Sequence, residues 1–403
     1  MNSGLLQRLI SANKGRDPEL LPLKFTAMRE SPFRFFRGTS PLFYEEFLKS
    51  PSEEDSTKVW ISGDLHPENF GFYKGDNGLV YFDVNDFDEA VLAPVSWEIC
   101  RFAASLYICS PAWQLGKKET DRLVTTFINH YSHCLAAGKP YAAEESLASA
   151  LIRIFFKQVK KRTERKLLKE RTAAKRIITG NGKAVPAAEE EKQQVREWIK
   201  QYFAGRKEKI KVHDVAVRIA GTGSLGLKRY IILAGYAKPG TGYLLLDLKE
   251  ARSSYLEQMI ETGQPAWTSE AERIVYVQQM AQYDIPRYLD VIDGDNRSYV
   301  VRELQPQADR INMAAINKKV NTIPQVIKEM ASAAAWSHLR CAGRKGATGV
   351  EELMVFAKEE KWKDSVKETG HRLAAVMQDL YTEYITLYDS GAFMERPASK
   401  RND

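Results

Sequence analysis

The feature that most constrains the fold is a β-rich block, residues 212–305, inside a chain whose other segments have a helical pattern. The segments VHDVAVRIA, LKRYIILAGY, YLLLDLKEA and SYVVRELQ are rich in β-branched, aromatic and leucine residues, and glycine-rich or polar turns separate them. A helical patch interrupts the block around residues 252–283. Apolar residues at helical spacing occupy the flanking segments 1–50, 95–200, 322–341 and 363–390. We therefore expect an α+β protein with two lobes, one small and β-rich and one large and helical.

The predicted domains follow this division. Residues 1–205 form a first helical part that contains a short catalytic and metal-binding hairpin, and residues 206–306 form the β-rich, nucleotide-binding part. Residues 307–403 return to helix and complete the helical lobe. A chain of 403 residues with 44% hydrophobic content is long enough for such a two-lobed unit with a sizeable core.

The charge and the cysteines limit the class of protein. A net charge of +7 favours an anionic partner, which could be a nucleotide, a nucleic acid or a membrane surface. The four cysteines form no CxxC pair and no His cluster accompanies them, so we expect reduced thiols in a cytoplasmic protein. The N-terminal segment lacks the apolar region of a secretory signal, and no apolar run is long enough for a membrane span.

Polar residues follow two short apolar runs between residues 58 and 90. The runs KVWIS and GLVYFDV are predicted to pair as a β-hairpin, and Asp64, Asn69 and Asp86 stand at the strand ends. Asp64 and Asn69 have the D-x-x-x-x-N spacing of a phosphoryl-transfer loop, in which the Asp accepts the acceptor's proton and the Asn holds Mg²⁺. Mg²⁺ prefers hard oxygen ligands shared with phosphates, so Asp86 would be the second protein ligand. The alternative is that these residues serve turns only.

The segment GTGSLG supplies a candidate phosphate lid. Its glycines are Gly221, Gly223 and Gly226, with Thr222 and Ser224 between them. A lone GxGxxG is weak evidence, because glycine is common in any tight turn. Here a predicted strand stands on each side of the motif, and strand–glycine loop–strand is the arrangement of a kinase-type lid over a nucleotide. A plain hairpin turn is the alternative.

Lys249 lies on the next predicted strand, YLLLDLKEA. Alternation places it on the opposite face from Leu244, Leu246 and Leu248. One strand after a glycine lid, Lys249 can reach the α- and β-phosphates of a nucleotide, although a single edge-strand lysine usually points to solvent.

A kinase lysine also needs an acidic partner. Glu257 is the nearest helical candidate, and Glu270 and Glu272 compete with it. The sequence does not separate the three.

The segment 157–176 contains ten basic and two acidic residues. As a helix it could bind nucleic acid or an anionic surface with strong salt dependence. No aromatic residues are interleaved for base stacking, which weighs against nucleic acid. A solvated helix face is the simpler interpretation, and such a face could also attract an acidic acceptor.

The combined motifs resemble known families. SGDLHPENFG followed by YFDVNDFDEA resembles the catalytic core of the aminoglycoside phosphotransferase and protein-kinase-like superfamily. Together with SPFRFFRG, GTGSLG, LKEARSS and WSHLRCAG, these motifs resemble the uncharacterised bacterial family domain of unknown function 2252, from about residue 20 to 390. The resemblance implies a protein-kinase-like fold without an established substrate. In ordinary kinases the glycine lid and lysine precede the catalytic loop, whereas Asp64 precedes Gly221 by about 150 residues, the order expected of a circular permutation.

The chain departs from the superfamily at two positions beside the catalytic loop. Ser62 stands where the superfamily commonly has His, which implies the loss of one scaffolding hydrogen bond, and Glu98 stands where relatives usually carry Asp. His338, on the helix that would lead into the catalytic loop, is expected to be a packed or capping residue.

The expected function is a phosphotransferase that uses ATP and Mg²⁺ to modify an unidentified small-molecule or protein hydroxyl. Asp64 would be the base, Asn69 and Asp86 the metal ligands, and Lys249 with the glycine loop the phosphate grip. Nucleotidyl transfer would use nearly the same groups. The alternatives are a nucleotide-binding pseudokinase and a binding module that uses the basic segment 157–176.

Overall fold

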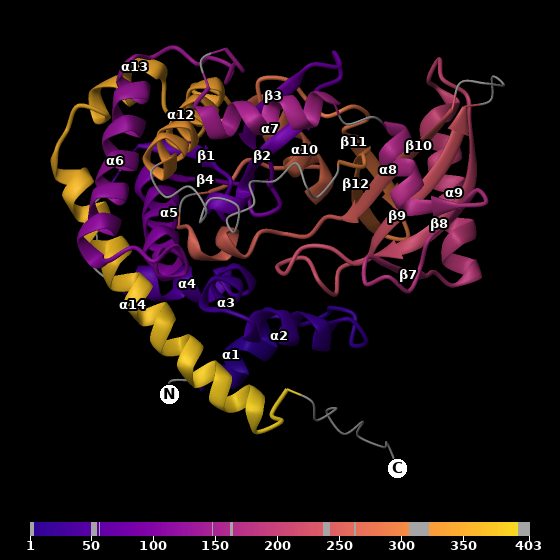
Figure 1. Ribbon diagram of the computed structural model, residues 1–403, viewed down its shortest axis with the longest axis horizontal. Helices are drawn as coiled ribbons and strands as arrows, with labels where there is room; N and C mark the ends of the chain where they lie inside the picture. Colours follow the sequence, from indigo (N-terminus) through magenta and orange to yellow (C-terminus); the bar gives the residue numbers. More distant parts are fainter. Residues whose placement is uncertain are drawn as a thin grey trace.

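The computed structural model describes residues 4–49, 55, 57–146, 148–161, 164–236, 242–261, 263–305 and 322–393, and it is a mixed α+β structure (Figure 1). Its α-helices are α1 (Leu5–Ala12), α2 (Leu21–Arg29), α3 (Pro32–Gly38), α4 (Ser40–Leu48), α5 (Val95–Cys109), α6 (Lys117–Ala136), α7 (Ala150–Lys161), α8 (Glu164–Arg171), α9 (Glu189–Ala204), α10 (Glu270–Ala281), α12 (Ile323–Cys341), α13 (Val350–Phe356) and α14 (Lys361–Asp389). Its strands are β1 (Lys58–Ile61), β2 (Phe70–Lys74), β3 (Val80–Val84), β4 (Val91–Pro94), β5 (Thr172–Ala173), β6 (Arg176–Ile177), β7 (Ala184–Pro186), β8 (Ile210–Arg218), β9 (Arg229–Tyr236), β10 (Tyr243–Glu250), β11 (Asp290–Gly294) and β12 (Arg297–Glu303).

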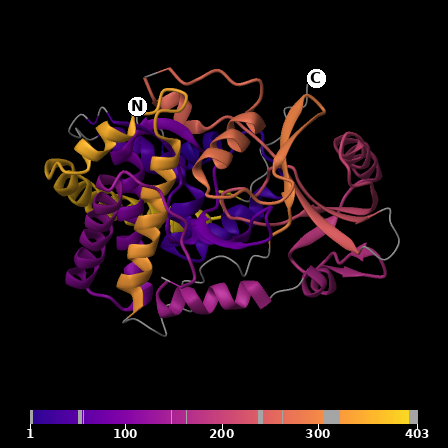
Figure 2. The same cartoon turned by 90° about the horizontal axis from the view of Figure 1, so that it is seen from above.

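The β-rich block supplies five strands of one antiparallel sheet of six, in the order β11-β12-β10-β9-β8-β7. The sixth strand, β7, comes from the segment 95–200, so the expectation that this segment is helical is wrong there. The glycine segment joins β8 to β9, so a strand precedes it and a strand follows it, as predicted. In the register of β9 and β10, Lys249 stands opposite Arg229. The sheet lies at one end of the molecule, and α5, α6, α12 and α14 gather at the other, as Figure 2 shows.

The two faces of the sheet are covered differently. Leu244, Leu246 and Leu248 pack with the apolar side of α9, while Leu245 lies on the opposite face in a second apolar cluster beside α8. The alternation predicted for this strand is therefore confirmed. The predicted domain limits remain predictions, but the packing crosses the limit at residue 206, because α8 and α9 cover the sheet.

The helical part is built from both ends of the chain. Helix α14 runs along α5 and also contacts α1, α2, α3 and α4, while α12 packs on α6. Gly370 of α14 allows the close approach to α5, since a Cβ added there would lie 2.7 Å from the Cβ of Ala103. All of these helices share one large apolar core, which also includes α10.

The predicted pairing of KVWIS with GLVYFDV is wrong. Strand β1, which contains KVWI, pairs with β4, and β3, which contains VYFDV, forms the hairpin with β2. The short strand β2 is the closer partner because the Gly75–Gly78 turn joins it directly to β3. The loop 62–69 therefore connects the two small sheets from one side, and residues 85–90 connect them from the other.

The basic segment 157–176 is not one helix. Its first residues end α7, residues 162–163 lie outside the described residues, and the rest forms α8 and the small strands β5 and β6. The division follows the packing. Phe155 and Phe156 of α7 contact Phe72 in the helical part, whereas Leu167 and Leu168 of α8 pack against the sheet.

Two further expectations concern the thiols and the membrane. All four cysteines are buried and free, in agreement with the prediction. Within the described ranges, no helix combines the length and the apolar character needed to cross a membrane.

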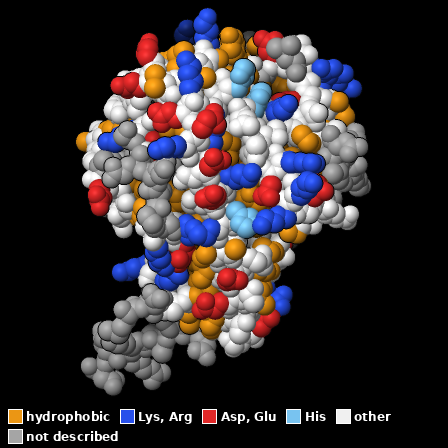
Figure 3. Space-filling view, turned by 90° about the vertical axis from the view of Figure 1, so that its left-hand side faces the viewer, with side chains coloured by type: hydrophobic (Ala, Val, Ile, Leu, Met, Phe, Trp, Pro, Cys, Tyr) orange, Lys and Arg blue, Asp and Glu red, His pale blue; other side chains and the backbone are white. Residues whose placement is uncertain are grey.

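The face over α6 and α14 carries acidic and basic side chains mixed together (Figure 3).

Candidate functional site

One buried carboxylate, that of Glu98, binds the beginning of the loop 62–69. Glu98, in the first turn of α5, accepts hydrogen bonds through Oε1 from Ser62 N (2.7 Å), Ser62 Oγ (2.5 Å) and Gly63 N (3.1 Å). Its Oε2 lies 2.8 Å from Nε2 of His338, whose Nδ1 lies 2.7 Å from the hydroxyl of Tyr131. The expected loss of a scaffolding bond at Ser62 is therefore wrong, because both its backbone N–H and its hydroxyl bind Glu98. His338 is a packed residue, as predicted.

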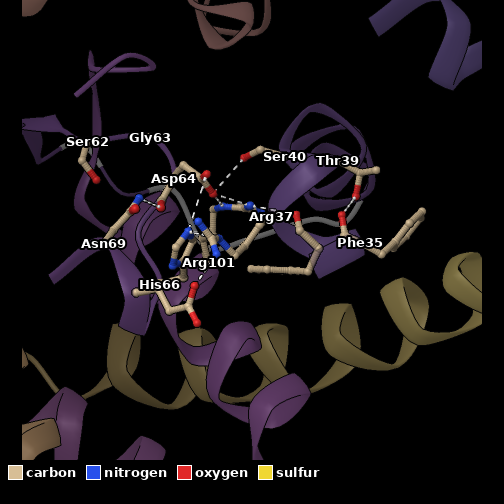
Figure 4. Close-up of polar contacts among 12 residues, drawn as sticks. Phe35, Arg37, Thr39, Ser40, Ser62, Gly63, Asp64, His66, Asn69 and Arg101 are labelled. Atoms are coloured by element: carbon tan, nitrogen blue, oxygen red, sulfur yellow. Dashed lines mark hydrogen bonds and ion pairs between the residues drawn. The ribbon is translucent and has the colours of Figure 1, made fainter. Parts of the chain in front are cut away.

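Asp64 projects from this loop and forms an ion pair with Arg101 of α5. Nε of Arg101 donates to Asp64 Oδ1 at 2.8 Å, Nη2 donates to the same atom, and Ser40 Oγ lies 3.4 Å from it (Figure 4). Arg101 is fully buried, and its guanidinium lies 4.1 Å from the ring centroid of Phe36. Burial raises the pKa of Asp64, Arg101 and Arg37 oppose the rise, and the nearby Asp86 adds to it.

Asn69 and Asp86 belong to the same site. The side-chain amide of Asn69 donates to the backbone carbonyl of Asp64 at 2.5 Å, and the backbone carbonyl of Asn69 accepts from Asn85 N at 2.9 Å. Asp86 follows β3 and lines the same cavity as Asp64. The structure thus places Asp64 and Asp86 on one cavity, while Asn69 is buried beside the backbone of Asp64 and is not among the residues that line the cavity.

Lys249 reaches this site from the sheet. Its side chain is 9% exposed, and Nζ forms an ion pair with the carboxylate of Asp88, two residues after Asp86. Within the described part of the chain no ion pair joins Lys249 to Glu257, Glu270 or Glu272. Glu257 lies in a short 3₁₀ turn (Tyr255–Met259). The other two bind residues near them in sequence: Glu270 contacts Arg273 and Ser253, and Glu272 contacts Thr268.

The acidic partner of Lys249 is therefore Asp88, which was not among the candidates proposed from the sequence. Asp88 sits in the same NDFDEA segment as Asp86, and a second acidic residue so close to the first is a signal that could have identified it. Because Lys249 and Asp88 are in contact, the acidic segment after β3 and the lysine strand meet across one site.

The glycine loop lies over the cleft. Gly223 and Ser224 line it, while Thr222 is buried. Gly221 and Gly226 have φ values of +76° and +87°, which glycine adopts without strain. At Gly223, a Cβ would lie 3.6 Å from the backbone oxygen of Arg37, so the loop passes close to α3.

The cavity between these elements has a volume of about 1140 Å³. Its wall includes groups that the sequence analysis missed, namely Arg16 from the connection between α1 and α2, Lys24 from α2, and Glu89 from the acidic segment. Burial raises the pKa of Glu89 to about 7, although the charge of Arg273 opposes the rise. No local motif marks Arg16 and Lys24, because their position depends on how the segment from α1 to α2 packs against the glycine loop, whereas Glu89 lies in the NDFDEA segment.

A second missed cluster lies on the sheet beside Lys249. Asp247 is buried and accepts from Arg229 Nε at 2.8 Å, and Arg218 Nη1 lies 2.7 Å from it. Arg302 Nε is 3.8 Å away. The two closer arginines hold the pKa of Asp247 well below its usual range, against the effect of burial. This face of the sheet is therefore strongly cationic.

Among the described residues, no group of three or more His, Cys, Asp or Glu side chains is arranged to hold a metal ion by itself.

Of three comparisons with known proteins, the comparison with protein families gives a match and the other two do not. No curated protein and no solved structure matches the chain. The profile of the family described as an uncharacterized protein conserved in bacteria, domain of unknown function 2252, matches residues 16–387. Since this match covers most of the sequence, the chain belongs to the bacterial family domain of unknown function 2252.

Proposed function

We propose that this protein is an ATP- and Mg²⁺-dependent phosphotransferase with a circularly permuted, protein-kinase-like fold. One observation carries the proposal: Asp64, Asp86, the glycine loop and the Lys249–Asp88 pair surround a single cleft, although they come from segments far apart in the sequence. Phosphoryl transfer depends mainly on positioning and on electrostatic stabilisation, and these groups are of the kinds that it uses.

The permutation is supported by how α12 meets the loop 62–69. His338 of α12 binds the same carboxylate, Glu98, that binds the backbone of this loop. Helix α12 also contacts β1, the strand that leads into the loop. In the unpermuted order, the end of α12 would lead directly into β1.

The residues present fit the two cofactors. Asn69 and Asp86 offer the hard oxygen atoms that Mg²⁺ prefers, with the remaining ligands expected from phosphates and water. The glycine loop has no side chain at Gly223 to obstruct a phosphate, and Lys249 supplies a positive charge at the strand end. When bound, Mg²⁺ would neutralise charge on the phosphates of ATP.

Asp64 is the group that takes the proton of the acceptor hydroxyl. Its Oδ1 is engaged by Arg101 and Ser40, whereas its Oδ2 has, among the described residues, a 3.9 Å approach to Nε2 of His66. The ion pair with Arg101 therefore fixes the carboxylate plane and leaves Oδ2 to accept the proton. Arg101 acts as a positioning residue, because it touches Asp64 and not the reacting atoms.

The test combines nucleotide binding with turnover. In the presence of ATP, addition of Mg²⁺ should raise the unfolding temperature. The corresponding gain in the free energy of unfolding is about 2.7 kcal/mol when the ligand is 100-fold above its Kd. The variant Asp86→Asn should lose the Mg²⁺-dependent part of this rise. The variant Asp64→Asn should keep it but lose turnover by about 10²-fold or more. Asp76→Asn, an exposed residue of the hairpin turn, is the matched control for loss of one carboxylate.

The position of the label distinguishes the alternatives. Transfer from γ-labelled ATP to a bacterial extract supports phosphotransfer, while transfer from α-labelled ATP alone would replace it with nucleotidyl transfer. Binding without either transfer would indicate a pseudokinase. If neither Asp86→Asn nor Asp64→Asn differed from the wild type, the assignment of the site would be abandoned.

A further inference from the structure

Helix α2 and the connection between α1 and α2 place two cations on the wall of the cleft, and neither forms an ion pair among the described residues. Lys24 of α2 is 3% exposed, and its Nζ donates to Asn13 Oδ1 at 2.7 Å. Arg16 is half-buried, and its Nη1 donates to the backbone oxygen of Leu225 in the glycine loop at 2.7 Å. Within the described residues, no carboxylate oxygen lies within 4 Å of either charged group. Both side chains line the cavity that contains Asp64.

Most of the other cations of the same wall have carboxylate partners, and Lys14, which has none among the described residues, is exposed to solvent. Arg8 forms ion pairs with Glu45 and Glu46. The further pairs are Arg37–Glu68, Lys49–Glu46 and Arg252–Glu250. A buried cation whose hydrogen-bond partners are neutral groups costs free energy, because burial removes its hydration. The carboxylates of Glu89 and Asp64, which act on Lys24 without an ion pair, oppose this effect of burial.

The electrostatic environment agrees with this geometry. Burial holds the pKa of Lys24 well below its ordinary value, and the charge of Arg16 lowers it further. Burial lowers the pKa of Arg16 to about 10, and the neighbouring Arg252 adds to the effect. An anion bound between Arg16 and Lys24 would relieve this repulsion.

The surroundings favour a phosphate group. Asp17 N donates to the oxygen of Gly226 at 2.8 Å, so the segment that carries Arg16 is joined to the loop whose residues Gly223 and Ser224 line the cleft. A phosphate is doubly charged at neutral pH and matches two cations, whereas a carboxylate matches one.

We propose that Arg16 and Lys24 form a phosphate-binding subsite on the wall of the cleft that contains Asp64. Two sources share this chemistry, the terminal phosphate of the nucleotide and a phosphate already carried by the acceptor. The choice between them rests on the proposed function, whereas the subsite itself does not require turnover.

The experiment measures binding of inorganic phosphate to the full chain by calorimetry, with potassium chloride at matched ionic strength as reference. Lys24→Met and Arg16→Met should each weaken phosphate binding by about tenfold or more. Lys118→Met, on the exposed side of α6, removes a lysine charge elsewhere and should bind phosphate like the wild type. Without phosphate, Lys24→Met should melt no lower than the wild type, because the variant removes a buried charge that lacks a carboxylate partner.

Contrary results are equally defined. Phosphate that fails to bind the wild type, or that binds Lys24→Met equally well, overturns the subsite. A much lower melting temperature of Lys24→Met without phosphate, together with unchanged binding in Arg16→Met, shows that the lysine serves structure only.

Two further measurements identify the source of the phosphate and distinguish failure of the subsite from failure of the proposed function. Phosphate binding that saturating MgATP abolishes assigns the subsite to the nucleotide, and binding that persists beside MgATP assigns it to a phosphorylated acceptor. If phosphate binds but no label is transferred in any assay, the subsite stands while the phosphotransferase function falls.

Discussion

The two loops that meet at the cleft are held in place by different means. The loop 62–69 rests on buried side chains, since Glu98 binds its backbone and Arg101 binds Asp64. The glycine loop is attached to the helical part through Asp17 and Arg16, which bind its backbone at the surface of the cleft. A loop held by a buried charged network is fixed before any ligand arrives, whereas a loop held by a few partly exposed bonds can open at low free-energy cost. Under the proposed function, catalytic geometry and ligand entry would belong to different loops.

The largest expected effect follows from removing the support of the first loop. Glu98→Ala leaves the N–H groups of Ser62 and Gly63 and the ring of His338 without their shared partner in the core. We expect a loss of about 3–5 kcal/mol in the free energy of unfolding, measured with urea. Glu98→Asp keeps the carboxylate and should lose less. A loss below about 1 kcal/mol in Glu98→Ala would mean that other contacts hold the loop.

An intermediate effect concerns pH and Glu89. Its pKa in the folded protein, about 7, lies above the ordinary value of 4.5, so the protonated form is favoured in the folded state. The resulting stabilisation is complete below pH 4.5 and is lost as the pH rises through 7, a change of about 3 kcal/mol. In Glu89→Gln this dependence is absent, while the amide oxygen can still accept from Tyr255 N. Measured by urea unfolding across this pH range, the free energy of unfolding of the variant should increase relative to that of the wild type as the pH rises. Parallel pH profiles of the two proteins would contradict the expectation.

The smallest expected effect is on the glycine loop. Gly226→Ala places a side chain at a φ of +87° and a Cβ 2.8 Å from the Cβ of Arg16. We expect a loss of about 1–2 kcal/mol in unfolding free energy. Gly223→Ala is the matched control, because its nearest neighbour outside the adjoining residues, the Arg37 oxygen, is 3.6 Å away and its φ is not positive. Equal losses in the two variants would show that backbone strain at Gly226 is not the cause.

Local periodicity predicted the strands of the β-rich block but not the short strands β5, β6 and β7, which lie in a segment expected to be helical. Alternation in YLLLDLKEA places Leu246 and Lys249 on opposite faces of β10, and the strands on both sides of the glycine loop follow from composition. The pairing of β1 with β4 could not be predicted in this way, because strand partners depend on how distant segments pack.

The candidate site was predicted in the same uneven manner. Asp64, Asn69 and Asp86 are near one another in sequence, so their spacing carried the information. The partner of Lys249 is 161 residues away, and no spacing rule selects Asp88 over Glu257. Arg101 could have been noticed, because an arginine within the otherwise apolar run ICRFAAS of a buried helix requires an acidic partner.

The order of the helices in the chain has a consequence for biosynthesis. Ser62 and Glu98 emerge early from the ribosome, but His338, which completes their buried network, is made 240 residues after Glu98. At about 5–20 residues per second, this delay is roughly 12–48 s. Helix α14, which closes the core over α5, follows later still. The nascent chain therefore exposes the apolar surface of its first helices throughout translation of the intervening sheet, a period in which binding by chaperones would protect it.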